Sequence, residues 1–338
     1  MIENFYIEEE IFRHPLTENI LKRIPHKNIE LIQNYADFFG RVKKPYLQKR
    51  NNLNAFIAQK KGQLVKSAPD AYGLSGEPHF YYIHAYNCIY ECEYCYLQGH
   101  FNSPDLVFFV NHNEIIAEMQ KVYDREIIKQ EADKKIWFHA GEFSDSLALS
   151  HATNEISLYH NFFEINKRAM LELRTKSANI NEILKLKPLP NIVTSFSLSP
   201  SQRAKKTDLK TPSTKHRILA MSKLQNSGHK VAIHLDPIVY EDNFQVAYQE
   251  LFHELDQNLD LTKVEYISAG VVRFTKDVYA QVEKNYPQSD IHAAEMIKSF
   301  DGKVRYPRPM RRWMLSSIED QLLKLKINTE KIYLCMED

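Results

Sequence analysis

From residue 78 onward, short runs of apolar, β-branched and aromatic residues alternate with longer amphipathic stretches. The apolar runs cover residues 80–85, 135–139, 170–174, 192–198, 231–235 and 264–269. The amphipathic stretches between them include residues 113–130, 213–227 and 243–255. Strands that alternate with helices along a chain indicate a parallel β/α architecture. The spacing favours an α/β fold with an open, partial (β/α)6 barrel of the TIM type, in which the chemistry lies at the carboxyl ends of the strands.

Residues 1–76, ahead of this alternation, are expected to form a helical, basic segment. Apolar residues at Ile20, Leu21 and Ile24, and again between Ile29 and Ile32, have helical spacing. The stretch from residue 38 to residue 69 contains eight lysines and arginines and no acidic residue. Two interpretations stay open for this stretch: a surface that contacts phosphates, or a solvated, flexible connector. The barrel is then expected over residues 77–275.

Residues 276–338 are expected to form a C-terminal extension that closes the barrel. It contains a run from Arg305 to Trp313 in which prolines separate basic and aromatic residues. This pattern predicts a hairpin or loop that contacts nucleic acid through Lys303, Arg305 and Arg308. The alternative is a charged edge segment that packs on the barrel.

Three of the four cysteines of the chain lie within eight residues, as Cys88-x3-Cys92-x2-Cys95. Cysteine thiolates at such short spacings hold iron–sulfur clusters. A 4Fe–4S cluster with three protein thiolates keeps one iron open, and that iron can chelate the amino and carboxylate groups of S-adenosylmethionine. The spacing resembles the signature of the radical-SAM superfamily, so these three residues are the expected metal ligands.

Two other interpretations of the cysteines are weaker. A zinc site would need His84 or His100 as its fourth ligand, but zinc sites usually contain paired Cys-x2-Cys knuckles and the chain has no second pair. A disulfide would leave one of three crowded cysteines without a partner.

Polar residues follow the predicted strands one after another, which indicates a polar mouth around the cysteine loop. An S-adenosylmethionine cofactor offers an ammonium, a carboxylate and a ribose to such a mouth. Lys176 suits the carboxylate, Ser144 or Asp145 the ribose hydroxyls, and Glu142 the ammonium. Ser197, at the end of the fourth strand, completes the expected cofactor site, although each residue could instead be a strand cap or a surface ion pair.

Composition limits the remaining possibilities. The chain has 338 residues, 43% of them hydrophobic and 26% charged, which fits one large or two modest globular domains. No apolar run is long enough to span a bilayer, and the acidic N-terminal stretch does not resemble a signal peptide. Together with free cysteines, this predicts a cytoplasmic protein without membrane contact. The net charge is only +1, so contact with nucleic acid must depend on local basic patches.

From about residue 40 to the end, the chain resembles the spore photoproduct lyase family of radical-SAM DNA repair enzymes. The matching motifs are Cys92–Gln98, Ser144–Asp145, Thr175–Lys176, Thr211–Ser213, Asp301–Tyr306 and Tyr333–Glu337. The resemblance implies a partial barrel and reductive cleavage of S-adenosylmethionine to a 5′-deoxyadenosyl radical. That radical would take a hydrogen atom from a thymine dimer in DNA, which then splits into two thymines.

One departure from the family concerns the hydrogen donor. In the family, a cysteine just before the Ser-Asp pair returns a hydrogen atom to the product radical, whereas this chain has Glu142 near that place. Tyr94 and Tyr96 match the tyrosines that relay a hydrogen atom in the family. We therefore expect Tyr96, with Tyr94 behind it, to supply the hydrogen atom directly. Cys335 lies in a motif that the resemblance marks as generally present, so a structural role is expected for it.

The sequence thus predicts a radical-SAM lyase that repairs a thymine dimer in DNA and receives electrons from a flavodoxin or a ferredoxin. It is expected to act as a monomer. The alternative enzyme is a divergent radical-SAM protein that acts on another nucleic-acid base or on a small molecule. The alternative outside enzymes is a metal-stabilised nucleic-acid-binding protein, which would form no 5′-deoxyadenosine.

Overall fold

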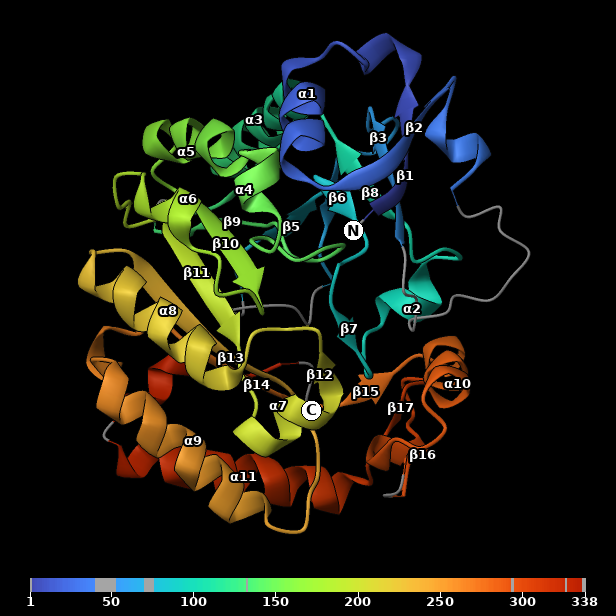
Figure 1. The fold of residues 1–338 in the computed structure, drawn as a ribbon. Helices are drawn as coiled ribbons and strands as arrows, with labels where there is room; N and C mark the ends of the chain where they lie inside the picture. The colour runs from blue at the N-terminus through green and yellow to red at the C-terminus, as the bar shows by residue number, and fades with distance from the viewer. Residues whose placement is uncertain are drawn as a thin grey trace.

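The computed structural model describes residues 2–39, 53–69, 76–131, 133–292, 295–325 and 327–335. Within these ranges the chain forms two large sheets, one from the N-terminal part and one from the barrel, with a smaller three-stranded sheet near the C-terminus (Figure 1). None of the helices in these ranges combines the length and the apolarity needed to cross a membrane.

The barrel sheet confirms the predicted alternation. Its strand order within the described residues is β18-β14-β13-β11-β10-β9-β5-β4. All neighbouring strands are parallel except β4 and β5. The strands are β4 Val65–Ser67, β5 His79–Tyr82, β9 Ile136–His139, β10 Ala169–Thr175, β11 Ile192–Ser197, β13 Lys230–Ile238, β14 Ile267–Val271 and β18 Ile332–Leu334. The six predicted strands correspond to β5, β9, β10, β11, β13 and β14, so the partial (β/α)6 barrel is confirmed.

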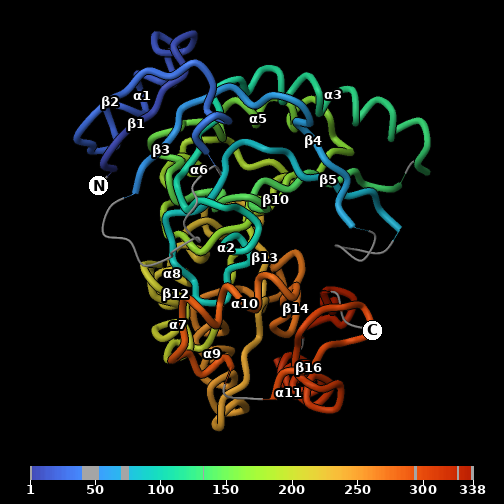
Figure 2. Tube along the Cα trace, turned by 90° about the vertical axis from the view of Figure 1, so that its right-hand side faces the viewer, coloured from blue at the N-terminus to red at the C-terminus, as the bar shows by residue number. Residues whose placement is uncertain are grey.

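Amphipathic helices connect the barrel strands and pack on the outside of the sheet (Figures 1 and 2). Three of them match the predicted amphipathic stretches: α3 His112–Lys129, α8 Thr214–Asn226 and α9 Phe244–Asn258. The others in this part are α4 Ser150–Thr153, α5 Ile156–Ile165, α6 Asn181–Leu184 and α7 Ser201–Thr207. Ser213 starts α8 as a side-chain cap, because its oxygen accepts a hydrogen bond from the backbone N–H of His216. The apolar faces of these helices and of the sheet form one continuous core.

The N-terminal part differs from the predicted helical segment. Three of its strands form a second sheet together with two strands from residues 85–109, in the order β2-β1-β3-β8-β6, while β4 joins the barrel sheet. The strands are β1 Ile2–Glu8, β2 His26–Ile32, β3 Leu53–Ala58, β6 Ala85–Tyr86 and β8 Leu106–Phe109. Helix α1 spans Pro15–Arg23, so the first apolar group is helical as expected. The prediction of helical structure for residues 29–32 is wrong, because these residues belong to strand β2, which pairs in parallel with β1.

The C-terminal extension also differs in part. Strands β15 Arg273–Phe274, β16 Ile297–Lys298 and β17 Val304–Arg305 form the small sheet. Strands β16 and β17 are antiparallel and form a hairpin that ends at the start of the Arg305–Trp313 run, in which a hairpin or loop was expected. Residues 308–324 are helix α11, Arg308–Lys324. Pro307 and Pro309 start this helix rather than break a loop, since proline is favoured in a first helical turn.

Two short pairings carry the cysteine loop. Strand β7 Glu91–Cys92 pairs in antiparallel fashion with β12 Asp208–Leu209. Helix α2 Leu97–His100 follows the last cysteine and packs against α10 Lys276–Asn285, beside which it lies in Figure 1. At Gly99 a Cβ atom would lie 2.6 Å from a methyl carbon of Val278, so only glycine allows this close approach. The loop is therefore held from the barrel on one side and from the C-terminal extension on the other.

Candidate active site

A cavity of about 500 Å³ opens at the carboxyl ends of the barrel strands. This volume is in the range of small-molecule sites. The cavity gathers eleven of the thirteen predicted site residues: Cys88, Cys92, Cys95, Tyr94, Tyr96, Glu142, Ser144, Asp145, Lys176, Ser197 and Lys303. Arg305 and Arg308 do not line it. Residues from distant parts of the sequence thus meet where the fold predicts chemistry.

A buried ion pair between Asp208 and Arg217 holds the cysteine loop in place. Cys92 pairs with Asp208 in the β7–β12 ladder, and the Asp208 carboxylate lies 2.8 Å from a guanidinium nitrogen of Arg217, both side chains being fully buried. The hydroxyl of Tyr94 donates a hydrogen bond to the same carboxylate. Arg217 also donates to the carbonyl of Pro212 at 2.9 Å, which gives the Thr211–Ser213 motif a structural task. The loop therefore rests on a rigid polar base.

The three thiols of this loop suit a multi-iron cluster. Cys88, Cys92 and Cys95 are free, and burial is the largest cause that raises the pKa of each thiol. Within the described residues, no three His, Cys, Asp or Glu side chains are grouped to hold one metal ion. A cluster takes its thiolates on different irons, so its ligands can surround a cavity without meeting at one point. The donor set and its arrangement thus fit a cluster better than a single zinc ion.

His84, one of the two proposed zinc ligands, has other partners. Its Nε2 lies 3.0 Å from the carbonyl oxygen of Ala140, and its Nδ1 lies 2.9 Å from the Glu155 carboxylate. Both ring nitrogens are occupied, so His84 is not available to a metal. His100 does line the cavity.

Glu142 lies three residues after the end of β9, on the cavity wall. Gly141 allows this approach, because a Cβ atom there would lie 2.8 Å from the carbonyl oxygen of Arg174. Burial is the largest cause that raises the pKa of Glu142, and Arg174 opposes it. The hydroxyl of Tyr96 donates a hydrogen bond to the backbone carbonyl of Glu142. Tyr96 therefore spans the mouth between the cysteine loop and the strand ends.

Asp145 has a structural task that competes with its predicted role at the ribose. Its Oδ1 accepts hydrogen bonds from the backbone N–H groups of Leu147 and Ala148, at 2.9 and 2.8 Å, and from the Thr175 hydroxyl at 2.7 Å. Its Oδ2 accepts from the backbone N–H of Lys176 at 2.8 Å. These four donors tie the loop after β9 to the end of β10 and use most of the capacity of the carboxylate. Ser144 is the better candidate for the ribose hydroxyls.

Lys176 and Ser197 continue the same wall. The ammonium of Lys176 lies 5.2 Å from the ring centre of Tyr94, between the cysteine loop and the strand ends. Ser197 ends β11 and is buried, while its carbonyl oxygen accepts a hydrogen bond from Arg217 at 2.8 Å. A cation and a hydroxyl next to the cysteines suit the polar groups of a bound cofactor.

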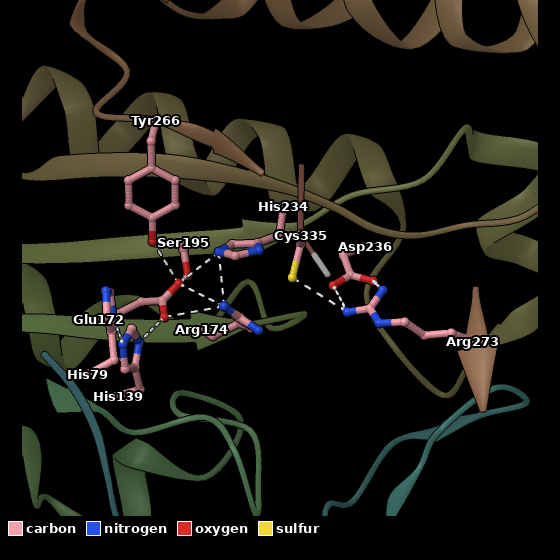
Figure 3. A network of polar contacts seen from close by, with 10 residues as sticks. All are labelled: His79, His139, Glu172, Arg174, Ser195, His234, Asp236, Tyr266, Arg273 and Cys335. Atoms are coloured by element: carbon pink, nitrogen blue, oxygen red, sulfur yellow. Dashed lines mark hydrogen bonds and ion pairs between the residues drawn. The ribbon is translucent and has the colours of Figure 1, made fainter. Parts of the chain in front are cut away.

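The opposite wall contains residues that the sequence did not single out as site residues. Arg174, Asp236, Arg273 and Cys335 all line the cavity. Arg273 holds Asp236 with two parallel hydrogen bonds of 3.1 Å, as Figure 3 shows. Asp236 follows the fifth predicted strand, so only the general expectation of polar residues at the strand ends applied to it. Arg273 and Cys335 come from segments beyond the predicted strand ends, and only the folded chain brings them here.

A buried carboxylate supports this wall from inside the barrel. Glu172 is 1% exposed and accepts hydrogen bonds from Ser195, His234 and Tyr266, at 2.7, 2.7 and 2.6 Å (Figure 3). Arg174 lies 3.3 Å from the same carboxylate. Burial opposes ionisation, but Arg174 and the neighbouring histidines hold the pKa of Glu172 well below its usual range. Glu172 is therefore an internal anion that orients the Arg174 guanidinium at the cavity.

The predicted nucleic-acid contacts are only partly brought together. Lys303 lines the cavity, and Arg308 is exposed at the start of α11. Arg305 does not lie on the surface, as a contact with nucleic acid would require. It is 0% exposed, and its guanidinium lies 3.1 Å from Asp301 and 3.1 Å from Ser299. These bonds close the hairpin from inside, so Arg305 stabilises its shape.

The tip of the hairpin is a feature that the sequence reasoning missed. Phe300 lies there with 87% of its surface exposed, next to Asp301 and Gly302 in the turn. The basic N-terminal stretch was expected to contact phosphates or to be a flexible connector. Five of its basic residues lie outside the described residues, so both interpretations stay open: Arg41, Lys43, Lys44, Lys49 and Arg50.

The comparisons with known proteins agree with this geometry. The profile of the family described as "Spore photoproduct lyase" matches residues 1–329. Spore photoproduct lyase of a Geobacillus species is 26% identical over 219 residues, which cover 64% of this chain and 63% of that protein. Spore photoproduct lyase of Bacillus subtilis is 25% identical over 301 residues, which cover 86% of this chain and 84% of that protein. The Geobacillus alignment thus spans less than two thirds of that relative.

Solved structures show the same fold. A spore photoproduct lyase mutant with bound AdoMet and dinucleoside spore photoproduct superposes with a TM-score of 0.80 and 18% identity, covering 100% of this chain and 99% of that one. A spore photoproduct lyase in complex with dinucleoside spore photoproduct gives a TM-score of 0.78, covering 99% of this chain and 98% of the other.

Proposed function

Because this chain belongs to the spore photoproduct lyase family, we propose that it is a radical-SAM lyase that splits a thymine dimer of the spore photoproduct type in DNA. One observation carries the proposal: a single cavity gathers the three cysteines of radical-SAM spacing with polar residues from the ends of four barrel strands. Relatives with this name and solved structures named with the lesion support the choice of substrate.

The proposed cofactors are a 4Fe–4S cluster on Cys88, Cys92 and Cys95, and S-adenosylmethionine beside it. When bound, they supply the 5′-deoxyadenosyl radical that takes a hydrogen atom from the lesion. Glu142 would accept hydrogen bonds from the ammonium, and Ser144 would bind the ribose. Lys176 would pair with the carboxylate of the cofactor, with Ser197 as a further polar contact.

The residues of the chain then orient the reactants and limit side reactions. The buried base under the cysteine loop, Asp208 with Arg217, keeps the loop in one position relative to the strand ends. Tyr94 and Tyr96 are the proposed hydrogen relay. Tyr96 is 37% exposed and faces the mouth, whereas the hydroxyl of Tyr94 is held by Asp208, so Tyr96 is the residue nearer to an incoming substrate.

DNA is the proposed macromolecular partner, and the hairpin β16–β17 is its proposed contact. Lys303 and Arg308 would bind phosphates, and the exposed Phe300 ring could wedge between bases and expose the lesion to the cavity. This revises the contact expected from the sequence, since Arg305 is engaged inside the hairpin. An electron donor of the flavodoxin or ferredoxin class, a cytoplasmic location and a monomeric state complete the proposal.

One observation favours a second candidate function. Glu142 is near the place where the family has its hydrogen-donor cysteine, and burial raises the pKa of Glu142. A protein with this change could act on another nucleic-acid base or on a small molecule through the same radical chemistry.

The test is an anaerobic assay. Reconstituted protein should bind about four irons per chain, and with reductant, S-adenosylmethionine and dinucleoside spore photoproduct it should release thymidine. The triple variant of Cys88, Cys92 and Cys95 to alanine should lose both the iron and the reaction. Formation of 5′-deoxyadenosine without thymidine would instead support the second candidate, and stoichiometric zinc without iron would contradict both.

A further inference from the structure

Cys335 is a wall residue of the cavity although it lies 240 residues after Cys95 in the sequence. Strand β18 pairs with β14 so that Leu334 lies beside Ala269, and the backbone N–H of Cys335 donates to the carbonyl of Ala269 at 2.8 Å. This pairing continues the barrel sheet by one strand and brings Cys335 to its carboxyl edge. The thiol is 3% exposed, so its environment is that of the cavity wall and not of the solvent.

Two charged neighbours hold the thiol in a defined environment. A guanidinium nitrogen of Arg273 lies 3.4 Å from Cys335 Sγ, and the same guanidinium is bound to Asp236 (Figure 3). Gly270 makes this arrangement possible, since a Cβ atom there would lie 2.9 Å from Arg273 and 3.0 Å from Asp236. Burial, followed by the Asp236 charge, raises the pKa of Cys335 to about 11. The group is therefore a protonated thiol at neutral pH, and it retains the S–H bond that a thiolate lacks.

The proposed reaction needs an S–H bond of this kind. After the dimer splits, one product thymine holds an unpaired electron on its methylene carbon and requires one hydrogen atom. The other described thiols of the cavity are the proposed cluster ligands. The phenol of Tyr94 is held by the buried Asp208, and the phenol of Tyr96, which donates to the carbonyl of Glu142, is left to restore the thiol after it has reacted.

We infer that Cys335 is the catalytic residue that donates the hydrogen atom to the product radical, in place of the structural role expected from the sequence. The inference rests on the proposed function and names the donor within it. It also changes the role of Tyr96, from direct donor to the residue that restores the thiol.

The step balances without an outside reductant. The S–H bond of Cys335 breaks, a C–H bond forms on the product methyl group, and the sulfur keeps one unpaired electron. The phenol of Tyr96 gives the sulfur a hydrogen atom and becomes a phenoxyl radical. The phenoxyl radical recovers a hydrogen atom from the methyl group of the 5′-deoxyadenosine that the first step leaves in the cavity, and this returns the unpaired electron to the 5′-deoxyadenosyl group that began the cycle. The hydrogen taken from the lesion is thereby replaced, and the repair is redox-neutral.

Cys335→Ser is the informative variant, because serine keeps the size of the side chain and the polar contacts with Arg273 and Asp236. Its O–H bond is too strong to give up a hydrogen atom at a useful rate. Cluster content and binding of the lesion should match the unaltered protein, while thymidine release falls at least about tenfold. The number of 5′-deoxyadenosine molecules formed per thymidine should rise, since the product radical is formed but not quenched.

Leu334→Ala is the matched control. It changes the last residue of β18, directly before Cys335, which is 46% exposed, so it tests whether disturbing β18 is enough to slow the reaction. It should leave both the rate and the product ratio unchanged. If Cys335→Ser has the same rate and ratio as the unaltered protein, this inference fails while the proposed function stands. If the unaltered protein itself releases no thymidine, the proposed function fails first.

A second measurement does not depend on turnover or on a variant. The cluster-loaded protein, with S-adenosylmethionine and without reductant, is treated with N-ethylmaleimide at about pH 9, where enough of the Cys335 thiol is ionised to react, and labelling of Cys335 is followed by peptide mass spectrometry. Saturating dinucleoside spore photoproduct should slow the labelling of Cys335 several-fold, because the lesion would cover the thiol. Equal labelling with and without the lesion would contradict contact between the two and overturn the inference.

Discussion

Arg217 and Asp208 form a fully buried ion pair, with 2.8 Å between Nη1 and Oδ2, directly under the cysteine loop. Asp208 is also the ladder partner of Cys92 and the acceptor for the Tyr94 hydroxyl. The pair therefore connects helix α8 to the cysteine loop, and its removal has effects on both stability and cofactor retention.

Arg217→Met should lower the free energy of unfolding by about 3 to 5 kcal/mol, because it leaves the Asp208 carboxylate buried without its partner. The same variant should reconstitute with less iron, since the base of the cysteine loop is loosened. Urea unfolding of the metal-free protein and an iron assay measure the two effects. Lys223→Met, an exposed position on the same helix, is the control and should change stability by less than about 0.5 kcal/mol. Equal stability of the two variants would contradict this prediction.

DNA binding should depend on the hairpin and on salt. If Lys303 and Arg308 bind phosphates, affinity for duplex DNA should fall steeply between about 50 and 200 mM salt, and the double variant to glutamate should show a shallower salt slope. Cleavage of S-adenosylmethionine in the absence of DNA is the internal check that the cavity is intact. Lys324→Glu, at the far end of the same helix α11, is the matched control. Equal loss of binding in that control would show that the contact is not local to the hairpin.

Phe300→Ala separates base contact from phosphate contact. The side chain is 87% exposed and contributes little to the folded core, so stability should be unchanged. Repair of the lesion in duplex DNA should slow, whereas repair of the isolated dinucleoside should not, because only the duplex must be opened. A uniform loss on both substrates would contradict a wedge role for this ring.

Tyr96→Phe should lower turnover while cluster content and the first cleavage of S-adenosylmethionine remain. The variant keeps the ring at the cavity mouth but removes the hydroxyl that donates to the Glu142 carbonyl. Without the phenol, the sulfur radical that hydrogen donation leaves on Cys335 is not converted back to a thiol. Thymidine should therefore appear as a single turnover followed by arrest. Rapid-quench measurement of thymidine per chain distinguishes this pattern from a slow steady rate, which would argue against a relay role.

Because of His112, the free energy of unfolding should fall as the pH decreases into the mildly acidic range. Burial is the largest cause that lowers the pKa of this residue to about 4, although the nearby Glu155 opposes it. The unfolded chain binds a proton below the usual histidine pKa and the folded chain does not, so stability is lost as pH falls through this window. The loss attributable to His112 should be about 2 kcal/mol between about pH 7.5 and about pH 5.

The measurement for this prediction is urea unfolding at both pH values. His112→Gln, which retains a polar contact with the Tyr159 hydroxyl, should remove about that much of the pH dependence. His253→Gln, at an exposed position of α9, is the control and should leave the pH dependence as it is. An unchanged slope in the His112 variant would show that the acid sensitivity arises elsewhere.

Local patterns predicted those features of this protein that depend on neighbours in sequence. The Cys88–Cys95 spacing brings three thiols to one loop whatever the rest of the chain does, and it was enough to predict the cluster site. The alternation of apolar runs and amphipathic stretches predicted six barrel strands, because a strand buried on both faces is a short continuous apolar run, whereas an amphipathic helix repeats its apolar positions every three to four residues. The polar residues after those strands were expected at one edge, and the cavity contains them.

Features that depend on pairing between distant segments were decided only by the tertiary structure. Residues 29–32 have apolar spacing that a helix or a strand can satisfy, and parallel pairing with β1 made them a strand. Arg305 has the sequence character of a surface contact, yet it is 0% exposed because Asp301 and Ser299 satisfy its guanidinium. Cys335 had no local signal for the active site. Its position follows from the β18–β14 pairing and from the Arg273–Asp236 pair, contacts between segments that no sequence period connects.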